Sequence, residues 1–511
     1  MTLSPCSGVL KRLSAAWLLV VSAGLAQAEV TLPAIFSDHM VLQRDAGVPV
    51  WGWAEPGETV TVNLAGQTRA TRAAPDRRWM VTFTDLRATG AMTLVVEGKN
   101  KLTINDVLIG EVWLGSGQSN MAMTVAASKD AAREAEGATF PLIRMFKEES
   151  PAAATPQDMG KGRWVVCSPD TVGASSATLF FFGRELHQAL NVPVGLINSS
   201  VGGTPIEAWI APEAQQAVPE LRSFLKEAEL ANAAIATPAA MEKYERDRAK
   251  WEEAAKKTRA TKQKAPKAPQ NPADVQARRG GVGGLYHGKI SPLIPYAIRG
   301  ALWYQGEANT PPAKAPFYEH QLRLLVNDWR ARWGYDFPIA WAQLPNFAGP
   351  GRDFPLVREA MLKTLALPKT GMGINIDIGE EKDIHPKNKQ EVGRRLSLWA
   401  LGTVYGRTVP ATSGPLPAGH EVRGQEILVR FAHTAGSLVL KSGASSGFVI
   451  AGEDRIWQPA QVRVAGDTVI VSSPAVAKPV AVRYAWENLP TVTLFNQADL
   501  PATPFRTDTW K

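Results

Sequence analysis

The sequence is poor in cysteine, since only Cys6 and Cys167 occur among 511 residues. If the N-terminal segment that holds Cys6 is removed, one cysteine remains, and an internal disulfide is excluded. Beyond residue 28 the sequence also lacks an apolar run of the roughly 20 residues that a membrane-spanning helix requires. The fold must therefore be stabilised by a hydrophobic core, for which 45% hydrophobic residues and 16 Trp provide the material.

Residues 1–28 have the features of a secretory signal peptide. Lys11 and Arg12 precede an apolar run from Leu13 to Leu25, and Ala26-Gln-Ala28 forms a small-residue cleavage site. The run is too short for a membrane anchor. We therefore expect export to the bacterial periplasm or the cell exterior, with no membrane attachment after cleavage.

Positive charge is concentrated in one segment of the chain. The formal net charge of +8 becomes +6 without Lys11 and Arg12. Residues 242–267 hold ten Lys or Arg against five Asp or Glu, and so account for +5 of this +6. The rest is nearly neutral, which argues against a nucleic-acid partner. We expect a solvated helical segment here; the alternative is a basic arm for an acidic polysaccharide.

Three regions of different pattern follow the signal segment. Residues 29–105 alternate apolar and polar positions between short turns, which predicts an N-terminal β-sandwich. In residues 106–410, apolar runs are followed by Gly-rich loops and helix-forming sequence, which predicts a parallel sheet with functional groups at the strand ends. A helical insertion is expected at about 211–280, and residues 411–511 predict a C-terminal β domain. The clearest expected strands of the middle region are 112–114, 194–197, 300–304 and 374–378.

Ser119 lies in a Gly-punctuated turn after an apolar run, in Gly110-Glu-Val-Trp-Leu-Gly-Ser-Gly-Gln-Ser-Asn-Met121. We expect helix from Met121 to Glu136, which would direct the Ser119 N–H and the helix dipole at a developing negative charge. Covalent catalysis needs such an exposed nucleophile, together with a base, an acid that orients the base, and oxyanion donors. Taken alone, the segment is equally consistent with Ser119 as a helix N-cap.

Two further loops contain candidate oxyanion donors. Gly202 and Gly203 follow an apolar run, and paired glycines let a backbone N–H approach a substrate closely. Gln305 and Glu307 follow the next run, where the Gln305 amide is a candidate donor and the Glu307 carboxylate a candidate anchor for loops. A tight turn is the alternative for the glycines, and a structural polar network is the alternative for Glu307.

Asp383 and His385 stand two residues apart in Asp383-Ile-His-Pro386. Residues two apart in an extended stretch face the same side, so the carboxylate can orient the imidazole as a general base. His287 is the rival base, but it has no acid nearby in sequence. We therefore predict a triad of Ser119, Asp383 and His385. No metal or nucleotide cofactor is expected, because metal-ligand and phosphate-loop motifs are incomplete.

Taken together, these segments resemble the SGNH hydrolases, most closely their sialate O-acetylesterase branch. The resemblance covers nearly the whole mature chain and is carried, in order, by residues 35–44, 110–121, 202–209, 303–307 and 383–386. It implies a flavodoxin-like three-layer α/β/α domain, here with flanking β-sandwich domains. It also implies an oxyanion hole formed by the N–H of Ser119, the N–H of Gly202 or Gly203, and the Gln305 side chain.

The resemblance further implies a serine esterase that removes acetyl groups from sugar hydroxyls without a cofactor. Gln118, Asn120, Glu307 and His287 are then candidates for the substrate pocket. Acetylated sialic acid and acetylated plant cell-wall glycans such as xylan or xyloglucan are both consistent with the sequence. A catalytically inactive carbohydrate-binding protein is the alternative outside the enzyme class.

Overall fold

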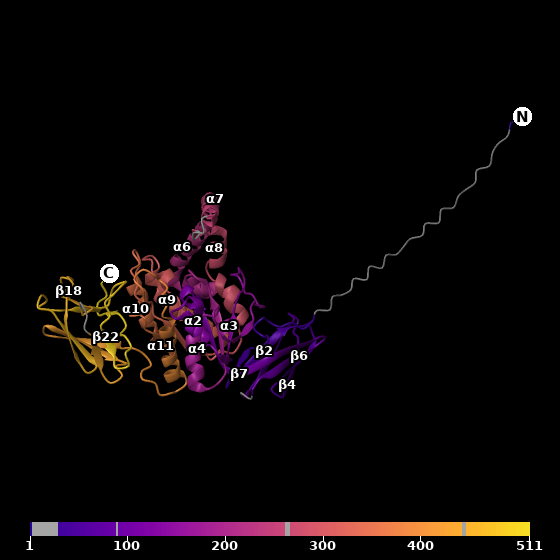
Figure 1. Ribbon diagram of the computed structural model, residues 1–511, viewed down its shortest axis with the longest axis horizontal. Coiled ribbons are helices and arrows are strands. Elements are labelled where there is room, and N and C mark those ends of the chain that lie inside the picture. The colour runs from indigo at the N-terminus through magenta and orange to yellow at the C-terminus, as the bar shows by residue number, and fades with distance from the viewer. Residues whose placement is uncertain (3–28, 88–89, 261–265, 442–445, 511) are drawn as a thin grey trace.

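The computed structural model describes residues 1–2, 29–87, 90–260, 266–441 and 446–510. The expected signal peptide, residues 1–28, therefore lies outside these ranges except for its first two residues. A central α/β region stands between an N-terminal and a C-terminal β region (Figure 1). None of the helices in the described ranges combines the length and apolar character needed to cross a membrane.

Strand β7 (Lys101–Gly117) joins the N-terminal β region to the central sheet. Its first part pairs with β1 (Val41–Gln43) and β6 (Met92–Glu97), and its last part pairs with strands of the central sheet on both sides. Every residue from Val107 to Gly117 is buried, as expected for a strand covered on both faces. The strand thus ends at Gly117, buried and paired with a neighbouring strand on each side.

The central sheet is mixed and has the order β13-β12-β11-β7-β10-β8-β9. Its pairs are parallel except for the antiparallel pair at one edge, β8 and β9. Gly117 is in register with Ser200 on one side and Tyr304 on the other, so three strands end together. The other strands of the sheet are β8 (Phe140–Lys147), β9 (Trp164–Cys167), β10 (Val194–Ser200), β11 (Gly300–Tyr304), β12 (Ile339–Ala342) and β13 (Thr370–Gly373).

Helices cover both faces of this sheet. Along β11, Ala301 and Trp303 pack in the core shared with α9 (Tyr318–Trp333) and α10 (Phe354–Thr364). The alternate residues Leu302 and Tyr304 pack in a second core shared with α4 (Ala177–Leu190) and α11 (Lys389–Trp399). This alternation follows from the two-residue period of a strand.

The two β regions that flank the centre are antiparallel except for one parallel pair, β1 and β7, in the N-terminal region (Figure 1). The N-terminal one adds β2 (Val48–Trp53), β3 (Thr59–Leu64), β4 (Gln67–Arg72) and β5 (Arg78–Phe83) to β1 and β6. The C-terminal one contains β14 (Leu416–Arg423), β15 (Glu426–Ala432), β16 (Leu438–Leu440), β17 (Phe448–Ala451), β18 (Gln458–Pro459), β19 (Gln461–Ala465), β20 (Thr468–Ser472), β21 (Ala481–Tyr484), β22 (Leu494–Asn496) and β23 (Phe505–Arg506).

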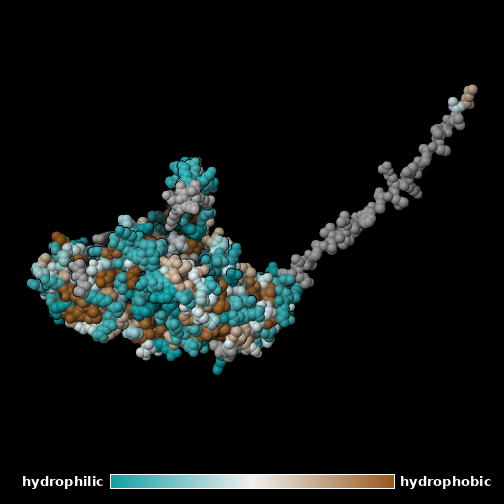
Figure 2. Space-filling view, viewed as in Figure 1, coloured by the Kyte–Doolittle hydropathy of each residue, from teal (hydrophilic) through white to brown (hydrophobic). Residues whose placement is uncertain are grey.

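A group of helices between β10 and β11 protrudes from the central region (Figure 1). It consists of α6 (Arg222–Ala233), α7 (Pro238–Ala260) and α8 (Pro272–Arg279), and α5 (Pro212–Gln216) lies at its base, where Glu213 pairs with Arg332 of α9. Its tip is hydrophilic (Figure 2), in keeping with the charged residues of α7. The protrusion therefore stands in solvent.

Two local predictions from the sequence are wrong. No strand forms at the expected residues 374–378, because β13 lies just before them and ends at Gly373. There the Asn375 side chain donates back to the Gly373 carbonyl and the chain turns. The helix expected from Met121 to Glu136 is broken into α1 (Ser119–Ala122), a 3-10 turn (Val125–Ala127) and α2 (Ala131–Glu136). The chain between them bonds to the segment before α4 through Val125 N–H and the Ser175 carbonyl.

Candidate active site

Ser119 is placed by the abrupt end of β7. Gly117 has φ +132°, and a Cβ there would lie 2.2 Å from the Tyr304 carbonyl oxygen, so only glycine fits this turn. Gln118 N–H then donates to the same carbonyl at 3.0 Å, and Ser119 begins the single-turn helix α1. Because it is the first helical residue, the Ser119 N–H has no acceptor among the described residues. A helix of four residues contributes little dipole, so this N–H itself is the important donor.

The structure brings His385 to Ser119. His385 Nε2 lies 2.8 Å from Ser119 Oγ, which is hydrogen-bond distance. On the other side of the ring, His385 Nδ1 lies 3.4 Å from Asp383 Oδ1, and the same oxygen accepts the His385 backbone N–H at 2.9 Å. The side chains of His385 and Asp383 are 41% and 46% exposed. A hydroxyl, an imidazole and a carboxylate are thus aligned at a surface that a substrate can reach.

Of the two candidate glycines, Gly202 lies closer to Ser119. A Cβ built on Gly202 would lie 3.5 Å from Ser119 Cβ, whereas one built on Gly203 meets no described atom within 4 Å. Gly203 has φ +73° and forms the turn. The Gly202 N–H has no acceptor within the described ranges. Gly202 is therefore the glycine that lies against Ser119, and the N–H groups of both residues have no acceptor among the described residues.

Gln305 is buried and its amide is already engaged. Its Nε2 donates to Asn309 Oδ1 at 2.7 Å and lies 3.2 Å from the Thr204 carbonyl and 3.3 Å from Gln118 Oε1. Direct donation to an oxyanion would require one of these bonds to break. This corrects the expectation of a free donor at Gln305. Through Thr204, the side chain instead supports the turn that carries Gly202.

Gln118, Asn120 and Glu307 are buried, with exposed fractions of 3%, 0% and 3%. The Glu307 carboxylate accepts the Gln118 amide on one oxygen at 2.6 Å and the Asn120 amide on the other. They support Ser119 from within the protein, which corrects the expectation that they line a substrate pocket. With Lys389, which donates to Asn120 Oδ1 at 2.8 Å, they form what we call the polar cluster.

Burial shifts the two ionisable groups of the polar cluster in opposite directions. It raises the pKa of the Glu307 carboxyl and lowers the pKa of the Lys389 ammonium to about 7, because the charged form of each loses its hydration. Lys389 was not among the site residues predicted from the sequence. Its position on the same helical stripe as Val392 and Leu396, spaced three and seven residues on, would have indicated a buried lysine.

No hydrogen bond or ion pair joins His287 to Ser119 in the part of the chain that the structure describes. It is 8% exposed and lies in the π-helical turn Tyr286–Ile290, where its N–H donates to the Gly283 carbonyl. The expected roles of His287 as a rival base or pocket residue therefore have no support in the geometry. Within the described ranges, no three His, Cys, Asp or Glu side chains are grouped so as to hold a metal ion.

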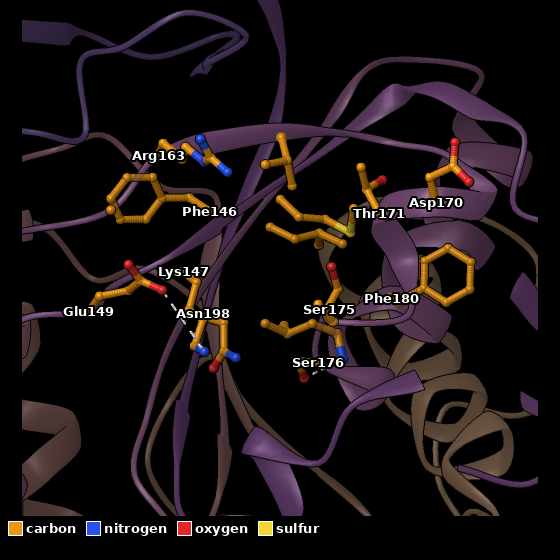
Figure 3. Close-up of a pocket in the computed structure, with 16 residues that line it drawn as sticks. Phe146, Lys147, Glu149, Arg163, Asp170, Thr171, Ser175, Ser176, Phe180 and Asn198 are labelled. Carbon is orange, nitrogen blue, oxygen red and sulfur yellow. Dashed lines mark hydrogen bonds and ion pairs between the residues drawn. The ribbon is translucent and has the colours of Figure 1, made fainter. Parts of the chain in front are cut away.

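A pocket of about 630 Å³ lies beside the site, between the ends of β8 and β10 and the start of α4 (Figure 3). Lys147 and Asn198, which pair in register across these strands, line one side, and Ser175 and Ser176 line the other. The Ser176 hydroxyl also donates to the Met121 carbonyl, so the wall of the pocket adjoins the turn after Ser119. None of the three triad candidates lines the pocket.

Comparison with known proteins gives consistent results. The family model described as carbohydrate esterase, sialic acid-specific acetylesterase matches residues 109–265 and 288–398, which include the three triad candidates. The sialate O-acetylesterase of Mus musculus is 29% identical over 92% of this chain and 92% of its own length. The sialate O-acetylesterase of Homo sapiens is 28% identical over 92% of this chain and 91% of its own length.

A solved structure extends the likeness to the whole fold. The crystal structure of a carbohydrate acetylesterase from Xanthomonas citri is 34% identical and superposes with a TM-score of 0.79. It covers 94% of this chain and 100% of its own. The similarity therefore includes the two β regions as well as the central sheet.

Proposed function

This chain belongs to the carbohydrate esterase family of sialic acid-specific acetylesterases, and on this premise we propose that Ser119 is the nucleophile through which it removes acetyl groups from sugar hydroxyls. Its activity is that of a carbohydrate O-acetylesterase. The assignment of the nucleophile is carried by one observation, the 2.8 Å contact between His385 Nε2 and Ser119 Oγ.

In the acylation step, His385 takes the Ser119 proton while Oγ attacks the acetyl carbonyl carbon. The imidazolium that forms is stabilised by the Asp383 carboxylate, which lies 3.4 Å from Nδ1. The N–H groups of Ser119 and Gly202 stabilise the oxyanion. The tetrahedral intermediate then collapses, the imidazolium gives its proton to the leaving sugar oxygen, and the acetyl group stays on Ser119.

In the deacylation step, water attacks the acetyl-enzyme with His385 again as the base. Acetate leaves and the proton returns to Ser119 Oγ. The exposure of the His385 and Asp383 side chains, 41% and 46%, suits both the departure of a bulky sugar and the entry of water. No step requires a cofactor.

We also propose a fold type, domain bounds and a location for this chain. The two-sided central sheet is the basis for proposing a flavodoxin-like SGNH domain at 106–410, between β domains at 29–105 and 411–511. Residues 1–28 are proposed to direct export to the periplasm or the cell exterior.

We expect Ser119→Ala to abolish hydrolysis of p-nitrophenyl acetate, because the acyl-enzyme cannot form. Initial rates of the variant and the wild type check this, with circular dichroism as a control for folding. Near-normal turnover in Ser119→Ala would remove the nucleophile assignment.

The wild type is then assayed for acetate release from O-acetylated sialic acid, xylan and xyloglucan fragments, which identifies the sugar. Glycan binding without acetate release would instead favour a carbohydrate-binding protein.

A further inference from the structure

One feature of the polar cluster goes beyond the triad: it holds the residues on both sides of Ser119 and on both sides of His385. The side chains of Gln118 and Asn120, which flank Ser119, donate to the two oxygens of Glu307. The carbonyls that flank His385 accept from the same cluster. Asn120 Nδ2 donates to the Ile384 carbonyl at 3.0 Å, and Lys389 Nζ donates to the Pro386 carbonyl at 2.5 Å.

We propose that Lys389 is a positioning residue for the hydrolysis, and that it acts by fixing the His385 loop to the Ser119 turn through Asn120 and the Pro386 carbonyl. This inference rests on the proposed serine–histidine chemistry. Lys389 is the only residue of the polar cluster that belongs to the helix following His385, so it links the two segments that carry the reacting groups.

The exposure of the His385 loop is a reason to expect this effect. The His385 and Asp383 side chains are about half exposed, so little packing restrains the imidazole on its solvent side. Lys389, in contrast, is 0% exposed, although burying an ammonium group is unfavourable. Its position between two acceptors, Asn120 Oδ1 and the Pro386 carbonyl, accounts for a buried lysine at this point of the fold.

The structure offers a matched control in Lys289. This lysine is also buried, 4% exposed, and its Nζ also donates to two acceptors, the carbonyls of Glu148 and Ser150. It bonds to neither the Ser119 turn nor the His385 loop. Lys289→Met and Lys389→Met thus remove the same kind of group, and only the second removes the link between Asn120 and the Pro386 carbonyl.

We expect Lys389→Met to lower kcat for p-nitrophenyl acetate by about 100-fold, with KM within about threefold of the wild type, because a shift of about 1 Å misaligns the base. Lys289→Met, assayed on the folded protein, stays within about threefold of wild-type kcat. Lys389→Arg, which keeps a cationic donor, recovers part of the loss. If Lys389→Met does not fold, Asn120→Ala serves instead, since it keeps the ammonium and is expected to lower kcat about tenfold or more.

A double-mutant cycle with His385→Ala tests whether Lys389 acts through the imidazole. Without the imidazole to position, Lys389→Met should cause no further loss. A further 100-fold loss in that background, or a kcat of Lys389→Met within threefold of the wild type, would overturn the proposal. If Ser119→Ala is inactive and Lys389→Met has the kcat of the wild type, only the role of Lys389 is wrong. If Ser119→Ala hydrolyses p-nitrophenyl acetate, the proposed function itself is wrong.

Discussion

The two halves of the candidate active site are built in different ways. On the serine side, Gln118 and Glu307 are each 3% exposed and Asn120 is 0% exposed, and the turn follows a strand buried on both faces. On the histidine side, the side chains of Asp383 and His385 are 46% and 41% exposed. The nucleophile is thus positioned by the sheet, whereas the base is positioned by hydrogen bonds that cross to its loop. Substitutions on the serine side should therefore affect folding and activity together, and substitutions on the histidine side should affect activity alone.

The largest effect should follow from Glu307→Ala on the serine side. It removes the acceptor of the buried Gln118 amide and one of the two acceptors of the buried Asn120 amide, and each such loss costs about 1–3 kcal/mol. We expect the free energy of unfolding in urea to fall by about 2–6 kcal/mol. We also expect kcat for p-nitrophenyl acetate to fall by more than about 100-fold, because Ser119 loses its support on both sides.

Glu149→Ala is the control for Glu307→Ala. The Glu149 side chain is 59% exposed at the end of β8, so its removal should change the free energy of unfolding by less than about 0.5 kcal/mol. If Glu307→Ala is as stable as Glu149→Ala and keeps wild-type kcat, the contrast between the two halves of the site is wrong.

A smaller effect, confined to activity, should follow from Asp383→Asn on the histidine side. Asparagine keeps an oxygen to accept the His385 backbone N–H but loses the charge that stabilises the imidazolium. We expect kcat to fall by about 100-fold to 1,000-fold while the melting temperature stays close to that of the wild type. Glu381→Gln, which changes an exposed carboxylate of the same loop, should leave both unchanged.

Wild-type kcat in Asp383→Asn would show that this carboxylate does not assist the base. A loss of stability as large as that of Glu307→Ala would show that the exposed loop is part of the folding core. Either result would contradict the comparison.

The parts of the site that the sheet positions were predictable from the sequence, and the parts that hydrogen bonds between distant residues position were not. Strand endings are local features, so the run 300–304 was predicted with the bounds of β11, and the turn at Ser119 follows from its glycines. Parallel strands end at one edge of a sheet, and this brings Ser119 and Gly202 together once the order is known. The α/β class was also predictable, because the alternation of apolar runs with helix-forming sequence is a local feature of the chain.

The contacts of the polar side chains were not predictable, because they join residues far apart in the chain. Gln305 was expected to donate to the oxyanion, but its amide is held inside the protein by Gln118 and Thr204, which come from two other loops, and by Asn309 of its own loop. Asn120 and Lys389 meet across 269 positions. A break in a helix is equally hard to predict when its cause lies far away in the chain. The helix expected from Met121 is broken where the Val125 N–H donates to the Ser175 carbonyl, 50 positions on.

The smallest effect concerns the pH dependence of stability, and it originates in Lys389. Burial lowers the pKa of Lys389 from 10.5 to about 7, against the opposing influence of the facing carboxylates of Glu307, Glu380 and Asp383. Between pH 7 and 10.5 the unfolded chain holds a proton that the folded chain has released. Stability therefore rises with pH in this window. Below pH 7 both states are protonated, and the cost of burying the charge is fully present.

From pH 7 to pH 9, Lys389 should add about 2 kcal/mol to the free energy of unfolding. Lys289, whose pKa burial also lowers, acts in the same direction, so the contribution of Lys389 is the difference between the wild type and Lys389→Met in urea titrations at each pH. That difference should shift in favour of the wild type as the pH rises. A constant difference would mean that Lys389 titrates as an ordinary exposed lysine, and that water reaches the polar cluster more than the burial of its residues indicates.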